Sequence, residues 1–91
     1  MARLFVRHDV ADFDQWRKGY DDPSRADLRS ELGVGGDGVY QAADRPTDVT
    51  VWHDFESVEA AQAFVSDPRL AAAMADLGVT GEPQIWITVE A

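Results

Sequence analysis

The two histidines of the chain, His8 and His53, are the residues with the clearest potential for chemistry. Each lies in an alternating segment, Val6-Arg7-His8-Asp9-Val10 and, forty-five residues later, Val51-Trp52-His53-Asp54-Phe55. Imidazole titrates close to neutral pH, so it can act as a general base or as a hydrogen-bond donor. The alternation places both histidines on the more apolar face of a strand. The alternative to a functional site is a pair of buried, hydrogen-bonded core histidines.

Side chains at helical spacing can form a pocket over these histidines. Phe13, Trp16 and Tyr20 recur at i, i+3 and i+7, the spacing of the inward face of a helix. Because the Tyr20 hydroxyl can orient a substrate oxygen, the candidate catalytic residues are His8, Tyr20 and His53. The candidate substrate-binding residues are Trp16, Phe64 and Met74, for which core packing is the alternative.

His8 is predicted to matter more than His53. The helix that follows His8 returns antiparallel over its own strand and should bring Trp16 and Tyr20 across the imidazole. The helix that follows His53 carries no polar side chain on its inward stripe. We therefore expect His8 to accept a proton while Tyr20 holds the adjacent oxygen.

Several kinds of site are excluded by residue type and position. The chain has no cysteine, so it contains no disulfide, thiolate metal site or cysteine nucleophile. Asp9 and Asp54 fall on the strand face opposite the histidines, which leaves a poor metal site. No serine is placed for a Ser-His-Asp triad, and the glycines of residues 33–38 follow a helix, so they predict a plain turn and not a phosphate loop. We expect no metal, flavin or haem.

The elements that position these residues are predicted from periodicity and from helix-end signals. Alternation predicts strands over residues 3–10, 39–43, 49–55 and 85–90, with a turn at 44–48. Asp-Pro pairs at 22–23 and 67–68 divide the helical region of each half in two, and Gly33 and Gly78 end the second pieces. The order β-α-β-β-α-β predicts a single α+β domain over residues 1–91, with a ferredoxin-like, four-stranded antiparallel sheet and helices on one face.

The histidine segments, the Asp-Pro pairs and the two glycines each recur forty-five residues apart, and this two-fold internal repeat supports the predicted fold but leaves one question open. In the predicted fold the two histidine strands are adjacent and antiparallel. If a pseudo-two-fold axis passes between His8 and His53, the rings are neighbours. If it passes near Val6 and Val51, each histidine faces a residue near Val49 or Leu4 instead. Both registers are compatible with the sequence.

Charge and composition limit the partners. The formal net charge is −9, which argues against nucleic acid or an anionic membrane surface as a partner. No segment approaches the roughly 18 apolar residues of a membrane span, and no signal peptide is evident, so a cytoplasmic protein is expected.

One face of the predicted sheet carries aromatic side chains that the helices leave uncovered. Phe5, Trp52 and Trp86 alternate with the residues assigned to the core, so they should share the opposite face of neighbouring strands. A cluster of large apolar side chains on the surface of a small protein indicates a protein partner. We predict a homodimer that forms through this face.

The chain resembles a known superfamily over nearly its whole length. The segments that carry the resemblance are LFVRHDVADFDQWRKGYDD, VTVWHDFESVEAAQAF and GVTGEPQIWITVE. They are similar to those of the dimeric α+β barrel superfamily, and within it to the small proteins grouped with antibiotic-biosynthesis monooxygenases and polyketide cyclases. Haem-degrading relatives use a helix histidine, which this chain lacks.

The resemblance implies a function. It implies cofactor-independent oxygenation or cyclisation of a small aromatic, polyketide-like substrate in a pocket between sheet and helices. Two alternatives stay open: a non-catalytic small-ligand-binding or stress-response barrel for an apolar or aromatic ligand, and a structural dimerisation module of a larger assembly. A cavity lined by both histidines favours the first two over the third.

Overall fold

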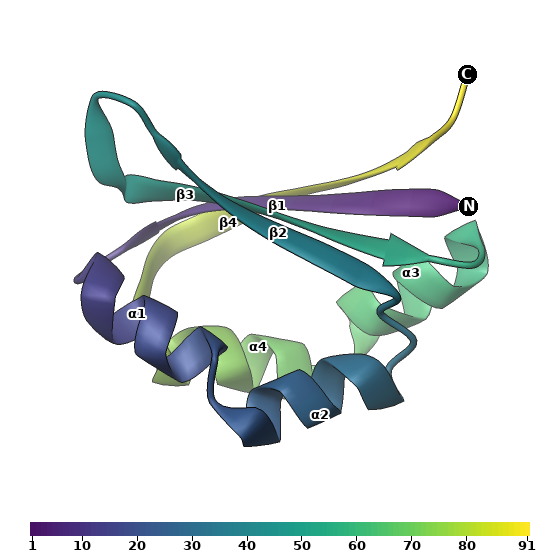
Figure 1. Cartoon of the computed structure of the whole chain (residues 1–91), viewed down its shortest axis with the longest axis horizontal. Helices are drawn as coiled ribbons and strands as arrows, with labels where there is room; N and C mark the ends of the chain where they lie inside the picture. Colours follow the sequence, from purple (N-terminus) through teal and green to yellow (C-terminus); the bar gives the residue numbers. More distant parts are fainter.

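Four strands and four helices make up the computed structural model, which describes all of residues 1–91 (Figure 1). The strands are β1 (Ala2–Val10), β2 (Gly36–Ala42), β3 (Arg45–Phe55) and β4 (Val79–Val89). The helices are α1 (Phe13–Tyr20), α2 (Pro23–Glu31), α3 (Val58–Ser66) and α4 (Pro68–Asp76). The sheet is antiparallel with strand order β2-β3-β1-β4, which confirms the predicted ferredoxin-like α+β fold.

Local capping interactions set the helix boundaries. Each helix begins after a side chain that accepts a hydrogen bond from a backbone N–H of the first turn. Gly33 and Gly78 follow α2 and α4 with φ of 93° and 78°, a region where residues with a Cβ are strained. None of the helices is long and apolar enough to cross a membrane. The four capping residues are Asp12, Asp22, Ser57 and Asp67.

Three strands are longer than the sequence pattern predicted. The turn predicted at 44–48 is wrong, because β3 already begins at Arg45 and the hairpin turn is confined to residues 43–44. Likewise β2 begins at Gly36 and β4 at Val79. The cause is irregular pairing: the register shifts between Gln41 and Ala42 in β2, and between Arg7 and Asp9 in β1. Such bulges let strands contain prolines that look like turn signals in the sequence.

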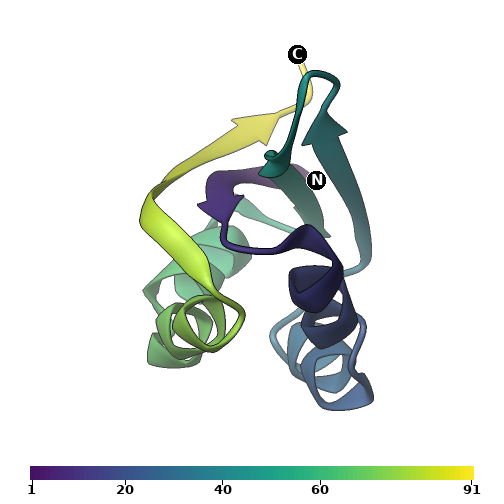
Figure 2. The same ribbon diagram turned by 90° about the vertical axis from the view of Figure 1, so that its left-hand side faces the viewer.

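All four helices cover one face of the sheet, and they do so as two separate pairs. Figure 2 shows α1 and α2 beneath one side of the sheet and α3 and α4 beneath the other. Side chains of β1 and β3 alternate between this covered face and the outer face, and the covered set is buried. The site described below lies on the helix-covered face of the sheet, over the middle of β1 and β3 and between the two helix pairs.

The register of β1 against β3 answers the question left open by the sequence. Val6 pairs with Val51, so the pseudo-two-fold axis passes through this pair. Leu4 pairs with His53 and Val49 with His8. The two histidines are therefore not cross-strand partners, and they lie diagonally on either side of the axis.

The outer face carries a continuous row of cross-strand neighbours. Gly38, Trp52, Phe5 and Trp86 are paired in that order across β2, β3, β1 and β4. Phe5 and Trp86 are stacked with ring centroids 5.4 Å apart, and the Arg3 guanidinium lies 4.0 Å above the Trp52 ring. A Cβ at residue 38 would overlap the Trp52 indole, so glycine is required for the ring to lie across β2.

Candidate functional site

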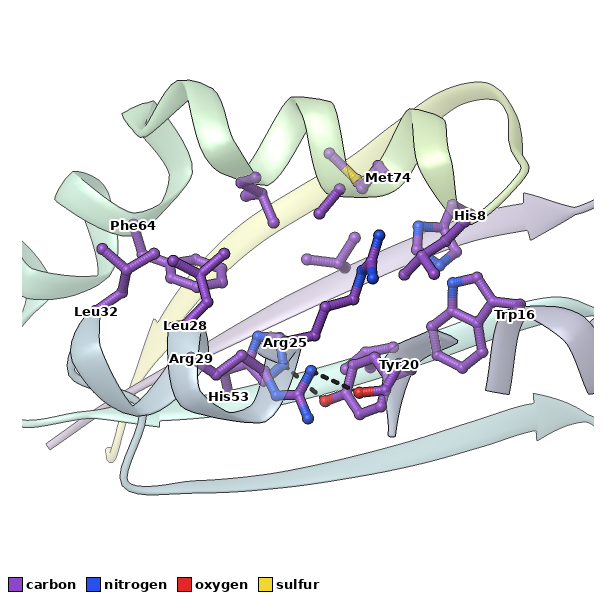
Figure 3. Close-up of a pocket in the computed structure, with 15 residues that line it drawn as sticks. His8, Trp16, Tyr20, Arg25, Leu28, Arg29, Leu32, His53, Phe64 and Met74 are labelled. Atoms are coloured by element: carbon purple, nitrogen blue, oxygen red, sulfur yellow. Dashed lines mark hydrogen bonds between the residues drawn. The ribbon is translucent and has the colours of Figure 1, made fainter. Parts of the chain in front are cut away.

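A cavity of about 70 Å³ lies between the sheet and the two helix pairs (Figure 3). One water centre requires about 10–15 Å³, so the cavity has room for several waters. Its wall is mostly hydrophobic. All six candidate residues from the sequence contribute to this wall: His8, Trp16, Tyr20, His53, Phe64 and Met74.

His8 is buried in this wall with unsatisfied hydrogen-bonding groups. Only 6% of its surface is exposed, and neither Nδ1 nor Nε2 has a hydrogen-bond partner in the protein. The ring packs edge-to-face against Trp16, with centroids 5.7 Å apart. Burial lowers the pKa of His8, so the ring is neutral at pH 7 and has one donor and one acceptor free to bind a molecule in the cavity.

His53 is held by a chain of hydrogen bonds that reaches the surface. The Tyr20 hydroxyl donates to Oδ2 of Asp37 at 2.8 Å. The Tyr20 hydroxyl oxygen also lies 2.9 Å from Nε2 of His53 (Figure 3, dashed line). A phenol has only one hydrogen to donate, and here the Asp37 carboxylate accepts it. Nε2 of His53 must therefore carry the proton and donate to Tyr20.

The hydrogen bonds from His53 through Tyr20 to Asp37 fix the tautomer of His53. With the proton on Nε2, the lone pair of the neutral ring is on Nδ1, and Nδ1 has no partner in the protein. Burial, and secondly the positive charge of Arg29, lowers the pKa of His53 to about 4. Burial, and secondly the hydrogen bond to Asp37, raises the pKa of Tyr20. At neutral pH the site therefore holds two uncharged imidazoles and a protonated phenol.

The expectation that Tyr20 lies beside His8 is wrong. The residue of α1 that contacts His8 is Trp16, and Tyr20, one turn further on, is bonded to His53. The stacked rings of Trp16 and Tyr20, 5.0 Å apart, span the distance between the two histidines. The physical reason is that Trp16 and Tyr20 lie one turn apart on α1, so that Trp16 contacts His8 of β1 while Tyr20 reaches His53 of the neighbouring strand β3.

The sequence interpretation missed three polar residues of the site. Asp37 lies in the glycine-rich segment that was predicted to be a turn. Because β2 already begins at Gly36, Asp37 pairs with His53 and shares the helix-covered face of the sheet, on the exposed edge strand. Arg25 and Arg29 line the cavity from α2. Their i, i+4 spacing was a usable signal, because it places them on the same helix face as Leu28 and Leu32. Arg29 donates from Nη1 to the Tyr20 carbonyl at 3.0 Å, and its guanidinium lies 3.8 Å above the Tyr20 ring.

The residues of the site form no metal centre. No group of three or more histidine, cysteine, aspartate or glutamate side chains is placed to hold a metal ion. Asp9 and Asp54 form ion pairs with Arg45 and Arg3 outside the cavity. The polar chemistry available in the cavity is therefore that of two neutral imidazoles, one phenol and two guanidinium groups.

Solved structures with the same fold include several described as antibiotic biosynthesis monooxygenases. A structure described as an antibiotic biosynthesis monooxygenase superposes with a TM-score of 0.75 at 7% identity, over 100% of this chain and 99% of the other. The monooxygenase ActVA-Orf6 of Streptomyces coelicolor, in complex with nanaomycin D, superposes with a TM-score of 0.73 at 20% identity, over 99% of this chain and 87% of the other. SnoaB of Streptomyces nogalater, a cofactor-independent oxygenase, superposes with a TM-score of 0.70 at 9% identity, over 98% of this chain and 91% of the other.

These comparisons define the class of fold. The chain has the fold of antibiotic biosynthesis monooxygenase-like proteins along its whole length. No protein-family model matches the sequence, and no curated protein is similar to it.

Proposed function

We propose that the protein is a cofactor-independent monooxygenase or cyclase-like enzyme that acts on a small aromatic, polyketide-like substrate in the cavity between sheet and helices. The observation that carries this proposal is the apolar cavity with two neutral imidazoles whose free nitrogens have no partner in the protein. Likeness of fold to a cofactor-independent oxygenase supports it. An apolar site with a few placed polar groups is the usual form of a small-molecule site.

His8 is the base in this proposal. A hydroxylated aromatic compound with a reactive CH₂ group loses one proton to His8, which leaves an electron-rich carbanion. This carbanion reacts with O₂ to form a C–O bond, and the resulting hydroperoxide loses water to leave a carbonyl group. One oxygen atom enters the product and the other leaves as water, and the four electrons that reduce O₂ come from the CH₂ group of the substrate. The protein needs only to remove and return protons.

The other side chains of the cavity position the substrate. Nδ1 of His53 accepts a hydrogen bond from a substrate hydroxyl, because Tyr20 and Asp37 keep its proton on the other nitrogen. Trp16 and Phe64 pack against the imidazoles of His8 and His53, with centroids 5.7 Å and 5.3 Å apart, so they hold the rings and exclude water. Met74 completes the wall on the α4 side.

Oxygen uptake with an anthrone as substrate tests the proposal. Wild-type protein, stripped of metals with a chelator, should oxidise anthrone to anthraquinone with one O₂ consumed per turnover. His8→Gln should lower the rate by about 10²–10⁴-fold, the usual effect of removing a general base. His53→Gln should lower it less, and circular dichroism checks the fold of both variants.

The outcomes separate the candidate functions. An unchanged rate in His8→Gln would show that His8 is not the base. Binding of anthrone without oxygen uptake in wild type would favour the non-catalytic ligand-binding alternative. A protein that neither binds nor oxidises anthrone or related phenols would contradict the proposal and favour a structural role.

A second copy of the chain is the partner proposed for the outer face of the sheet. The aromatic row leaves Trp86 43% exposed, and the flanking charges are balanced by ion pairs of Arg3 with Asp54 and Arg7 with Asp48. Two copies can therefore meet at this face without charge repulsion, although each carries a net charge of −9.

Sedimentation equilibrium tests the proposed homodimer. Wild type should be dimeric at micromolar concentration, and Trp52→Asp or Trp86→Asp should be monomeric because a buried unpaired charge typically costs several kcal/mol, ~3–5. Ala72→Asp, which adds the same charge at an exposed position of α4, is the control and should stay dimeric. A monomeric wild type would rule the dimer out.

A further inference from the structure

The charged residues that line the cavity are of one sign. Among the lining side chains the only charged ones are Arg25 and Arg29, and no aspartate or glutamate is present. This is the reverse of the chain as a whole, which has 17 acidic and 8 basic residues. The cavity is thus a positively charged site in an acidic protein.

The two arginines are held differently. Arg29 is bonded to the Tyr20 carbonyl and stacked on the Tyr20 ring, so its position is accounted for by its neighbours. The Arg25 side chain makes no hydrogen bond, and its Nε is buried without a partner. Its only ion pair is with Asp76 at 3.7 Å, and the Asp76 side chain is 73% exposed. Such a pair, long and open to water, contributes little.

We infer that Arg25 binds a carboxylate carried by the ligand of this cavity, and that the ligand is a ring carboxylate. The inference rests on the proposed function in that it concerns the same site. A guanidinium with an unpaired buried N–H is unfavourable unless an anion or another acceptor reaches it. The planar fork of arginine matches a carboxylate, to which it donates two parallel hydrogen bonds.

The rest of the cavity determines the body of this ligand. Figure 3 shows the Arg25 side chain extending from α2 across the cavity toward the end that holds His8. The α4 side opposite is formed by Leu70, Ala73 and Met74, which offer no hydrogen bond to a ligand. The ligand therefore has a flat or cyclic apolar body, with its anionic group on the α2 side.

Calorimetric titration with a matched pair of probes tests this. 2-Naphthoate and 2-naphthamide have nearly the same shape and differ in charge. A hydrogen bond to a charged group is worth about 1.5–3 kcal/mol, so wild type should bind the carboxylate roughly 10- to 100-fold more tightly. Arg25→Gln should bind both probes with the affinity that wild type shows for the amide.

Two further variants separate ligand binding from a structural role. Asp76→Asn removes the competing carboxylate and should keep or increase the preference for naphthoate. If Arg25 served only to hold α2 against α4, Asp76→Asn and Arg25→Gln would instead behave alike. Arg69→Gln is the matched control, because Arg69 also links α4 to α2 through Glu31, at 3.6 Å, but does not line the cavity. It should leave the preference unchanged.

Several results would overturn the inference. Equal binding of the two probes by wild type, or a preference that survives Arg25→Gln, would show that Arg25 does not select an anion. If anthrone is still oxidised in that case, the proposed function stands and only the inference fails. If neither probe binds and no phenol is turned over, both fail together.

Discussion

Replacing Tyr20 with phenylalanine tests the hydrogen-bond chain that fixes His53. The substitution removes one oxygen atom and leaves the ring, which is stacked on Trp16 at 5.0 Å and covered by Arg29 at 3.8 Å. The packing of the aromatic wall should therefore persist. What changes is that Nε2 of His53 and Oδ2 of Asp37 both lose a partner.

The expected loss of stability follows from the burial of these two groups. Asp37 is exposed, so water replaces the phenol at its carboxylate at little cost. His53 is only 4% exposed, so its Nε2 is left without any partner. An unsatisfied buried donor costs about 1–3 kcal/mol, and we expect the free energy of unfolding of Tyr20→Phe to fall by that amount.

Urea unfolding and nitrogen NMR measure the two consequences. At a urea dependence of about 2 kcal/mol per molar, a loss of about 2 kcal/mol lowers the midpoint by roughly 1 M at fixed protein concentration. Tyr40→Phe is the control, because Tyr40 is 63% exposed and its hydroxyl makes no hydrogen bond within the protein that would be lost. The ¹⁵N spectrum of wild type should show the His53 proton on Nε2, and Tyr20→Phe should shift the population toward the other tautomer.

Two results would refute this reasoning. A proton on Nδ1 of His53 in wild type would contradict the donor order deduced from the Tyr20–Asp37 bond. A loss of stability in Tyr20→Phe no larger than in Tyr40→Phe would show that the chain does not hold His53.

Two further predictions concern pH and a close packing contact. The pKa of His53 is about 4 in the folded protein against an ordinary 6.5, so the unfolded chain binds the proton more tightly. The contribution of neutral His53 to the free energy of unfolding is complete above pH 6.5 and is lost as the pH falls toward 4. Urea titrations should show about 3 kcal/mol less stability at pH 4 than at pH 7, and His53→Gln should remove most of this pH dependence. Gly38→Ala places a Cβ against the Trp52 indole and should cost about 1–3 kcal/mol, with an altered near-UV spectrum, whereas Gly35→Ala should cost less because only an ordinary contact lies near. Equal unfolding midpoints for the two alanine variants would contradict the packing argument.

The features predicted correctly are those encoded over short stretches of chain. Caps and stop signals such as Asp22 and Gly33 act within one helical turn, so they can be identified without knowledge of the fold. Alternation likewise assigned His8 and His53 to the covered face of the sheet, where both are buried. The six candidate residues line one cavity because these inward faces are assembled by a single simple topology.

The features missed depend on contacts between distant segments. The register of β1 against β3 is set by packing across the sheet, and it decides that the histidines lie apart. The partnership of Tyr20 with Asp37 and His53 requires both this register and the placement of α1 over the sheet. Pro46 is typical of a turn but lies within β3. The irregular pairing that accommodates it has no signature of its own in the sequence, so this part of the strand could not be predicted.

The position of the pseudo-two-fold axis has a consequence for how a flat molecule sits in the cavity. The wall consists largely of residues related by the forty-five-residue offset, so a perfectly repeated chain would offer such a molecule two equivalent orientations. The halves differ in that Arg25 and Arg29 occupy the positions of Leu70 and Met74. Under the proposed function, this difference would select one of the two orientations and so determine which edge of the molecule meets His8, which is the regioselectivity of the reaction. The lining pairs related by the offset are Val6 and Val51, His8 and His53, Arg25 and Leu70, Leu28 and Ala73, Arg29 and Met74, and Leu32 and Leu77.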